Sequence, residues 1–440
     1  MSKRISGFSK LSKEEKLRWL NDNYLQPASG SDEVLKHFWL EDNPTQKIID
    51  GFSENTVSNY ILPYGLAPNF LVDGKLYCVP MVIEESSVVA AAAAAAKYWL
   101  DRGGFKTTIL GTTKIGQIHF KWSGPKTILE EVFEDIRTKL LQGAAPITQN
   151  MEKRGGGVVK IELIDFNGHE AGLYQIRVYF DTKDSMGANF INSVLENFAA
   201  TLEQYFVNED RIPDHFRDVD VIMSILSNYT PECTVRAEVS CRVDVLGTFS
   251  NGMMAEQLAE KFRMAVRIAH IDPYRATTHN KGIYNGIDAV VLATGNDFRA
   301  IEAAGHAYAA RDGQYRSLSN CEVSDGLFRF WLEVPLAIGT VGGLTVLHPL
   351  AKKSLGILGN PSAQELMRII ASVGLAQNFA AIKSLVTTGI QKGHMKMHIM
   401  NILNHLQASD EEIRKAIQYF EDKTVSFTDV RDYLLELRQY

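Results

Sequence analysis

The stretch that decides the fold is residues 270–299, which read HIDPYRATTHNKGIYNGIDAVVLATGNDFR. Within it, Ala289 to Ala293 form a short, continuously apolar run, which predicts a β-strand buried on both faces. Lys281 precedes this run, and Asp297 follows it on a predicted loop. A lysine held in a deep site beside a carboxylate stays protonated and can stabilise a developing oxyanion. A surface lysine and an aspartate in a turn give the same pattern, so both interpretations stay open on these residues alone.

The composition is that of a globular protein with two or three domains. The chain has 440 residues, of which 45% are hydrophobic and 22% charged, and a net charge of −6. A net negative charge does not indicate binding to nucleic acid, although it does not exclude a local basic patch for an anionic cofactor. The longest run of small apolar residues, Val88 to Ala96, is too short to cross a bilayer. The four cysteines lack metal-type spacing and fit a reducing cytosol, so we expect a cytoplasmic protein without membrane contact.

Residues 1–108 are expected to form the first part of a large domain. Their local patterns predict a capping box at Ser12–Glu15, a short helix at 54–62 and a hairpin over Phe70–Val82 that turns at Asp73-Gly74. Seven consecutive alanines then predict a helix that packs closely against its neighbours. Glu84 and Glu85 stand at the entrance of this helix, where a carboxylate must be solvated, paired or protonated.

The pattern changes over residues 109–228. Strands are expected at 117–122, 158–166, 173–181 and 219–226, and helices at 127–141 and 188–206. The order β-α-β-β-α-β is the split βαβ arrangement of ferredoxin-like domains. We therefore predict an α+β protein in which this domain is inserted into a larger mixed α/β domain.

The large domain is expected to resume over residues 229–390. Strands at 234–243 and 328–334, a helix at 252–269 and two helices at 363–375 and 376–385 are predicted. After Gly393 the composition becomes charged, and a capping box at Ser409–Glu412 opens the first of two short helices. A small, charged helical tail after a glycine hinge, residues 391–440, is expected to be mobile.

Several short motifs could bind a ligand. No Gly-x-Gly-x-x-Gly follows a strand, so a conventional dinucleotide fold is unsupported. The glycines at 155–157 and 339–343 could let backbone amides approach a phosphate, or could simply be turns. Residues 184–189 lie where a strand gives way to a helix, which suits a pyrophosphate or an ordinary N-cap. His394 and His398 share a helical face, but without a third ligand nearby we expect no metal.

Five separated blocks carry a resemblance to a known family. They are Glu84–Ala90, Asp184–Asn189, His270–Arg299, Gly339–Gly343 and Gly389–Met395. In their order and spacing they resemble the corresponding blocks of class II, bacterial-type 3-hydroxy-3-methylglutaryl-coenzyme A (HMG-CoA) reductases. The resemblance spans nearly the whole chain, to about Asn401. It implies that the inserted domain binds the dinucleotide and that residues 391–440 are a flap over the substrate.

The resemblance also implies the activity. Members of this family reduce HMG-CoA to mevalonate and coenzyme A, in the mevalonate pathway of isoprenoid biosynthesis, with two nicotinamide hydrides. By the same resemblance Glu85, Lys281, Asp297 and His394 are the catalytic residues. Lys281 would hold the oxyanion, His394 would protonate the departing thiolate, and Glu85 would donate a proton to the aldehyde. Glu85 must be neutral at that step, so a proton network with Asp297 and Lys281 is expected.

The ligand contacts follow from the same matching. Substrate contacts are implied for Ser87, Arg275 and Asn285, and an arginine can grip a carboxylate bidentately. Cofactor contacts are implied for these residues: Lys160, Asp184, Met186, Gly187, Asn189, Gly339, Gly342 and Gly343. Lys160 stands where NADH-preferring relatives carry an acid, so NADPH is favoured over NADH. Ser86 departs from the family's usual proline, which we expect to alter only the turn.

The last expectations concern the oligomeric state and the alternative functions. The family buries its site between subunits, so an obligate homodimer is expected, and trimers of dimers are compatible with it. The same site could work mainly in the oxidative, mevalonate-degrading direction. A non-catalytic acyl-coenzyme A-binding relative is a further alternative, which the presence of all four catalytic residues disfavours. A different two-domain dehydrogenase is disfavoured by the missing dinucleotide motif.

Overall fold

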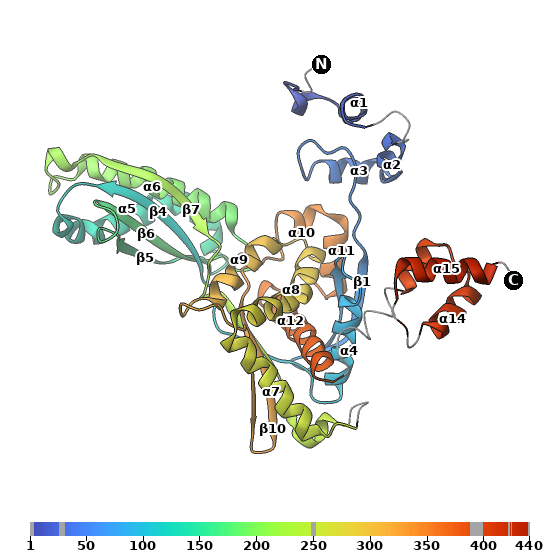
Figure 1. The fold of residues 1–440 in the computed structure, drawn as a ribbon. Helices are drawn as coiled ribbons and strands as arrows, with labels where there is room; N and C mark the ends of the chain where they lie inside the picture. The colour runs from blue at the N-terminus through green and yellow to red at the C-terminus, as the bar shows by residue number, and fades with distance from the viewer. Residues whose placement is uncertain are drawn as a thin grey trace.

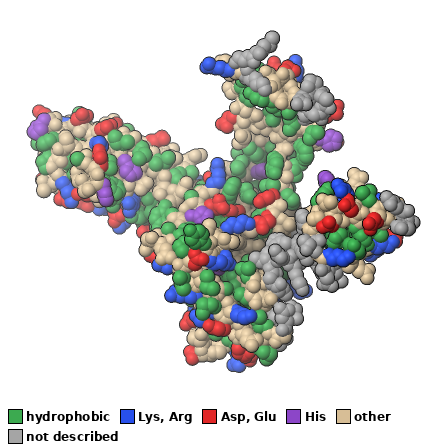
Figure 2. All heavy atoms as spheres, viewed as in Figure 1, with side chains coloured by type: hydrophobic (Ala, Val, Ile, Leu, Met, Phe, Trp, Pro, Cys, Tyr) green, Lys and Arg blue, Asp and Glu red, His purple; other side chains and the backbone are tan. Residues whose placement is uncertain are grey.

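The computed structural model describes residues 4–25, 31–247, 252–387, 399–420, 423 and 425–438. These residues form a central body with three projecting parts, which are the N-terminal helices, a four-stranded part and a C-terminal helical group (Figure 1). Buried apolar side chains form three separate clusters, in the body, in the four-stranded part and in the C-terminal group. Acidic and basic side chains are interspersed over the face shown in Figure 2. The α+β prediction is confirmed, whereas the predicted domain boundaries stay predictions.

The N-terminal part consists of α1 (Lys13–Asn23), α2 (Ser31–His37) and α3 (Asn43–Asp50). The predicted capping box is present, because Ser12 and Glu15 exchange side-chain and backbone hydrogen bonds at the start of α1. The predicted helix at 54–62 is wrong. Asn55 has a positive φ of 59°, and the Thr56 hydroxyl donates to the Ser53 carbonyl at 2.9 Å, so this segment forms turns instead.

The predicted hairpin consists of β1 (Tyr64–Val72) and β2 (Lys75–Val82), which pair antiparallel. Asp73 and Gly74 both have positive φ, 49° and 86°, as a two-residue turn of the primed type requires. The alanine-rich helix α4 (Val88–Leu100) follows, and Ala92 and Ala96 are fully buried. The loop that carries Glu85 therefore runs between a strand and a helix that are both anchored in the body.

The body contains a second, antiparallel sheet, covered by a long helix. Its strands lie in the order β3 (Lys106–Ile109), β8 (Thr234–Arg242), β10 (Leu327–Pro335) and β9 (Ser319–Ser324). The helix α12 (Ala363–Val386) replaces the two helices predicted for this segment, since nothing between Leu375 and Ala376 interrupts it. By length and composition α12 could cross a membrane, but 67% of its most apolar window is buried inside the protein.

The organising stretch is helical, so the strand predicted at Ala289–Ala293 is wrong. These residues are the last turn and a half of α8 (Pro273–Ala293), which begins with Asp272 as N-cap and Pro273 in its first turn. A helix buried on most sides gives the same short apolar run as a buried strand, so the run alone could not separate them. The backbones of α8 and α12 approach closely at Gly286, where a Cβ would lie 2.9 Å from the Val373 carbonyl oxygen.

The four-stranded part has the predicted element order β-α-β-β-α-β. Its sheet has the order β5-β6-β4-β7 and is antiparallel throughout, with both helices on one face (Figure 1). The helix predicted at 127–141 continues to Glu152. The elements are β4 (Lys114–Trp122), α5 (Lys126–Glu152), β5 (Gly157–Asp165), β6 (Leu173–Asp181), α6 (Ala188–Asn208) and β7 (Val219–Ser227).

The remaining helices surround the body or lie beyond it. Four of them cover the body, namely α7 (Ala255–Ile271), α9 (Phe298–Ala309), α10 (Leu344–Leu347) and α11 (Pro349–Ile357). Beyond the body, residues 399–405, α14 (Asp410–Tyr419) and α15 (Phe427–Arg438) pack around their own small apolar cluster (Figure 1). The capping box predicted at Ser409 is present. Three 3-10 turns complete the part of the chain that the structure describes, at Phe8–Lys10, Asp214–Phe216 and Val243–Leu246.

Candidate active site

An ion pair between two of the predicted catalytic residues forms the first half of the site. The Lys281 ammonium on α8 donates to Glu85 Oε2 at 2.6 Å. Asn285, one helical turn further, donates to the same oxygen at 3.3 Å. The Lys281 side chain is 61% exposed and that of Glu85 35%, so the pair is open to a ligand from solvent. The structure thus brings together three of the predicted residues, from elements far apart in the sequence.

Ser87, a predicted substrate contact, lies on the same loop as Glu85 in an uncommon backbone conformation. Its φ of 75° is left-handed, which for a non-glycine residue costs of order 1 kcal/mol. Ser87 is the N-cap of α4, yet its hydroxyl makes no capping hydrogen bond. The hydroxyl is therefore available to a ligand next to Glu85.

Arg275, the other predicted substrate contact, lies near the start of α8. At about 100° of rotation per residue, it projects from a different face of the helix than Lys281. Within the part of the chain that the structure describes, Arg275 makes no ion pair, and burial lowers the pKa of its guanidinium. A half-buried arginine without a carboxylate partner among the described residues suits an anionic ligand.

Asp297 lies at the other end of α8, away from the ion pair. It is the N-cap of α9, where its carboxylate accepts from the backbone amides of Arg299 and Ala300. It also forms an ion pair with the Arg299 side chain at 3.2 Å. Lys281 and the end of α8 are separated by twelve residues, or roughly 18 Å of helix. Within one chain, the expected network therefore contains Glu85 and Lys281 but not Asp297.

Asp297 instead lines a cavity of about 600 Å³ that forms the second half of the site. Most of the residues predicted to bind the cofactor line the same cavity, namely Met186, Gly187, Asn189, Gly339, Gly342 and Gly343. A Cβ at Gly342 or Gly343 would meet nothing within 4 Å, so the backbone there is open to a bulky ligand. Gly187 is the N-cap of α6 and has no side chain to cap the helix, which leaves its first amides free for an anion.

The two glycine-containing loops of this cavity hold each other in place. The Asp184 carbonyl accepts from the Thr340 amide at 2.8 Å, and Gly339 donates to Asn296 Oδ1 at 2.8 Å. A Cβ at Gly339 would lie 2.3 Å from the Met186 amide nitrogen, so only glycine fits. The Asp184 carboxylate accepts from the Ala363 amide at the start of α12, at 2.7 Å. Of the predicted cofactor residues, Asp184 thus shapes the loop from behind rather than lining the cavity.

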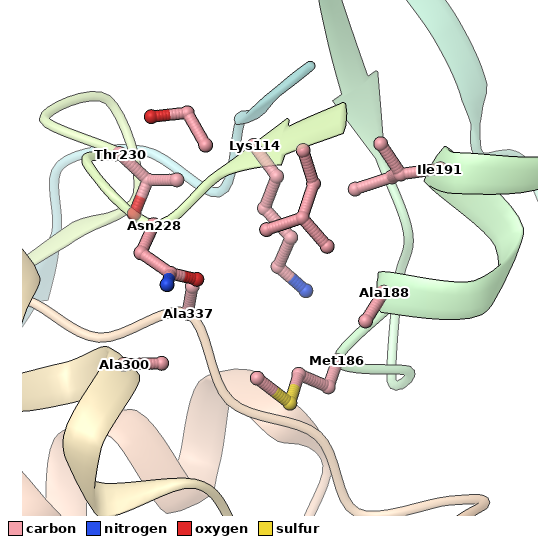
Figure 3. A pocket seen from close by; sticks show the side chains of 10 residues that line it. Lys114, Met186, Ala188, Ile191, Asn228, Thr230, Ala300 and Ala337 are labelled. Carbon is pink, nitrogen blue, oxygen red and sulfur yellow. The ribbon is translucent and has the colours of Figure 1, made fainter. Parts of the chain in front are cut away.

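Lys114, which sequence reasoning missed, also supports this loop. Lys114 as a whole residue is only 5% exposed. Its ammonium donates to Thr182 Oγ1 at 2.6 Å and to the Ser185 carbonyl at 2.7 Å. Figure 3 shows it pointing towards Met186 and Ala188 in a small cavity at the junction of the four-stranded part and the body. Burial lowers the pKa of this lysine. No sequence pattern marks it, because a lysine on a strand is usually exposed.

The last two predicted residues lie outside this arrangement. Lys160 is on the edge strand β5, where its ammonium pairs with Glu162 and lies 5.3 Å from the Tyr179 ring centroid. It does not line the cavity. His394, like His398, falls outside the described residues. Among the described residues, no three His, Cys, Asp or Glu side chains form a group that could hold a metal ion.

Comparisons with protein families, with related proteins and with solved structures agree on one family. Residues 13–399 match the family described as hydroxymethylglutaryl-coenzyme A reductase. The chain is 38% identical over 420 residues to the 3-hydroxy-3-methylglutaryl-coenzyme A reductase of Archaeoglobus fulgidus, covering 95% of this chain and 91% of the relative. It is 32% identical over 403 residues to the probable reductase of Borreliella burgdorferi, covering 92% and 89% of the two chains.

Solved structures agree with these relatives. The reductase of Streptococcus pneumoniae superposes with a TM-score of 0.72 and 37% identity, covering 98% of this chain and all of the other. A structure of the class II enzyme from the same organism, bound to NADPH in open conformations, gives a TM-score of 0.71 and 38% identity over 87% of this chain. A lysine–glutamate pair and a glycine-lined cavity at opposite ends of one helix thus occur in a fold shared with class II reductases. The chain belongs to the hydroxymethylglutaryl-coenzyme A reductase family, as the sequence predicted.

Proposed function

We propose that the chain reduces HMG-CoA to mevalonate and free coenzyme A, consuming two NADPH and two protons, as a cytoplasmic enzyme. The observation that carries this proposal is the 2.6 Å contact between Lys281 and Glu85, with Asn285 on the same carboxylate. A cation next to an acid, open to solvent, can neutralise charge that develops on a carbonyl oxygen and supply a proton afterwards.

The residues of this chain would act in sequence on the substrate. When bound in the glycine-lined cavity, NADPH supplies the hydride for each of the two reductions. Lys281 holds the oxyanion that forms on the thioester carbonyl, and the resulting hemithioacetal releases mevaldehyde and the coenzyme A thiolate. His394 protonates that thiolate, and Glu85 donates a proton to the aldehyde oxygen in the second reduction. Arg275 and Ser87 would hold the substrate carboxylate and hydroxyl.

The stoichiometry of the reaction tests this proposal directly. With HMG-CoA limiting, we expect two NADPH to be oxidised for each coenzyme A thiol released. The absorbance of NADPH and a thiol reagent measure the two quantities in one sample. A ratio of one would indicate that the reaction stops at the aldehyde, and no oxidation at all would favour a non-catalytic acyl-coenzyme A-binding protein.

We further propose that the working unit is a homodimer whose active sites combine residues of both subunits. The roughly 18 Å between Lys281 and the Asp297 end of α8 is too long for the two to meet in one chain. α8 also presents an exposed or half-exposed stripe to solvent, formed by Lys281, Asn285, Asp288 and Leu292. A second copy related by a two-fold axis could bring its Asp297 and cavity to this stripe.

The N-terminal segment supports an assembly of this kind. Tyr60 is 91% exposed and Ile61 62% exposed on the chain that leads from α3 to the body (Figure 1). Large apolar side chains exposed on a projecting segment are unusual in a monomer and typical of a surface that another chain covers. The N-terminal part would therefore pack on the second copy.

NADPH rather than NADH is the proposed cofactor. The solved relative from Streptococcus pneumoniae is bound to NADPH. Lys160 of β5 lies opposite Tyr179 of β6 in the sheet. β6 ends at Asp181, shortly before the loop of residues 184–189. Lys183 lies near the Gly155 backbone, two residues before β5, and its ammonium pairs with Asp181 at 2.9 Å. Two ammonium groups there favour the additional 2′-phosphate of NADPH.

Replacing Lys160 by glutamate tests this preference. Lys160→Glu should lower kcat/KM for NADPH by about tenfold, since one charge contact with a phosphate is worth about 1 kcal/mol or more, while kcat/KM for NADH changes little. Lys121→Glu is the matched control, because this lysine is an exposed residue on β4 that also pairs with a glutamate. An equal loss with both cofactors would show that Lys160 does not read the 2′-phosphate.

A further inference from the structure

The loop between β6 and α6 is held from behind by a buried lysine to which the proposed mechanism gives no role. Lys114, the first residue of β4, donates from its ammonium to Thr182 Oγ1 at 2.6 Å and to the Ser185 carbonyl at 2.7 Å. Thr182 is also buried, and its hydroxyl donates to the same carbonyl at 2.7 Å. The Ser185 oxygen thus accepts two hydrogen bonds, which use both of its lone pairs and fix the direction of the carbonyl group.

The direction of the Ser185 carbonyl determines the direction of the next amide. The described part of the chain contains no cis peptide bond, and across a planar trans peptide the N–H points opposite to the preceding C=O. The Met186 N–H therefore points away from Lys114. Gly339, which lines the large cavity, approaches the Met186 nitrogen so closely that a Cβ on Gly339 would lie 2.3 Å from it. The amide thus lies on the cavity side of the loop, and the lysine on the other side.

The Met186 amide is available to a ligand. Among the hydrogen bonds of the described turns and loops, none uses this N–H as donor, whereas the next amide, of Gly187, donates to Ser185 Oγ at 3.1 Å. Met186 itself lines the large cavity, together with Ser185 and Gly187. A backbone N–H that faces a cavity without a protein acceptor suits an anionic group such as a phosphate.

Lys114 also brings a positive charge that no carboxylate neutralises by direct contact within the described residues. Asp181 and Asp184 are the acids near enough to act on it. Asp181 is paired with Lys183 at 2.9 Å, and Asp184 accepts from the Ala363 amide at 2.7 Å. Burial lowers the pKa of the Lys114 ammonium, and the two acids act in the opposite direction. The charge is therefore free to polarise the peptide group that the ammonium contacts.

We propose that Lys114 is a positioning residue for the dinucleotide: it orients and polarises the Ser185–Met186 peptide so that the Met186 N–H binds the pyrophosphate that NADPH and NADH share. This inference rests on the proposed reductase function, because it requires a dinucleotide in the glycine-lined cavity. Lys114 does not line that cavity, so it acts through the peptide and not by contact. The peptide dipole carries the effect of the buried charge from one side of the loop to the other.

Replacing Lys114 by methionine tests this role, because the variant keeps an unbranched side chain and removes both hydrogen bonds. Lys114→Met should raise the Kd of NADPH by about tenfold, since the amide that binds a phosphate is no longer held in place. The Kd of NADH should rise by the same factor, because both cofactors contain the pyrophosphate. Fluorescence of the bound reduced nicotinamide measures each Kd without turnover. At saturating NADPH, the KM for HMG-CoA should stay within about twofold of the wild type.

A second variant and a control show whether the effect passes through the Ser185 carbonyl. Thr182→Val keeps the shape of the side chain without its hydroxyl and should also raise both Kd values. Because the two side chains act on one carbonyl, the double variant should raise each Kd by less than the product of the two single factors. Lys121→Met is the matched control, since Lys121 is an exposed lysine of the same strand, paired with Glu170, and both Kd values should stay unchanged.

The possible results separate the explanations, with thermal unfolding to confirm that each variant is folded. Unchanged Kd values in folded Lys114→Met would overturn the inference, as would a loss much larger for NADPH than for NADH, which would place the effect on the 2′-phosphate. Should Lys114→Met fail to fold, unchanged Kd values in Thr182→Val would overturn it equally. If the wild type binds both dinucleotides but does not oxidise NADPH with HMG-CoA, the proposed function is wrong, and the Kd comparison still decides the role of Lys114.

Discussion

Replacing Lys281 by alanine is expected to lower kcat/KM for HMG-CoA by about 10³-fold or more, because the variant lacks the cation that faces the developing oxyanion. Removal of a single donor to an oxyanion costs about 10²–10³ in rate, and here the donor is also the only charged partner that the structure gives Glu85 within the described residues. Steady-state rates of NADPH oxidation measure the loss. The effect should fall on kcat more than on KM, since the interaction is made in the transition state.

Two further variants show whether charge is the cause. Lys281→Arg keeps the charge but changes its geometry, so it should recover only part of the activity. Asn285→Ala removes a weaker contact to the same Glu85 oxygen, at 3.3 Å, and should cost about tenfold. The role of Lys281 is wrong if Lys281→Ala retains activity within about tenfold of the wild type.

The sequence predicted the local elements well where turn and capping residues mark them. The Asp73-Gly74 turn, the capping boxes at Ser12 and Ser409 and the β-α-β-β-α-β order are all present. Each depends on neighbours within a few positions, so the sequence contains what is needed to find it. The family resemblance then extended these local patterns to the whole chain.

The errors occur where tertiary burial replaces the local pattern. Ala289–Ala293 are apolar because α8 is enclosed by α12 and its other neighbours, and a buried helix loses the polar face that would have identified it. The sequence analysis also divided α12 into two helices between Leu375 and Ala376, where the structure has one continuous helix. Periodicity cannot separate helix from strand in a segment that is apolar on all sides.

The sequence likewise predicted only part of the candidate site. Sequence blocks identified Glu85, Lys281 and the cavity glycines, but they could not show that Asp297 lies at the far end of α8 from Lys281. They also gave no sign of Lys114, because a buried ionisable group is recognised by its surroundings and not by its neighbours in sequence.

Co-expression of two inactive variants should restore activity if each active site combines two subunits. In a dimer of one Lys281→Ala chain and one Asp297→Ala chain, one site receives the intact Lys281 and the intact Asp297, while the other site has neither. Random pairing yields half heterodimers with one working site each, so about one quarter of the wild-type activity is expected. Each chain carries a different affinity tag, so that purification over both tags isolates the heterodimer, which should show about half the wild-type activity.

The matched control uses the contact that the structure shows within one chain. Glu85 and Lys281 meet at 2.6 Å in the same subunit, so co-expressing Glu85→Gln with Lys281→Ala leaves each site lacking one of the two, and no activity should return. Recovery with the Asp297 pair but not with the Glu85 pair requires that Asp297 come from the second copy. If neither pair recovers activity although heterodimers form, Asp297 and Lys281 must act within one chain, which would require α8 to break between them.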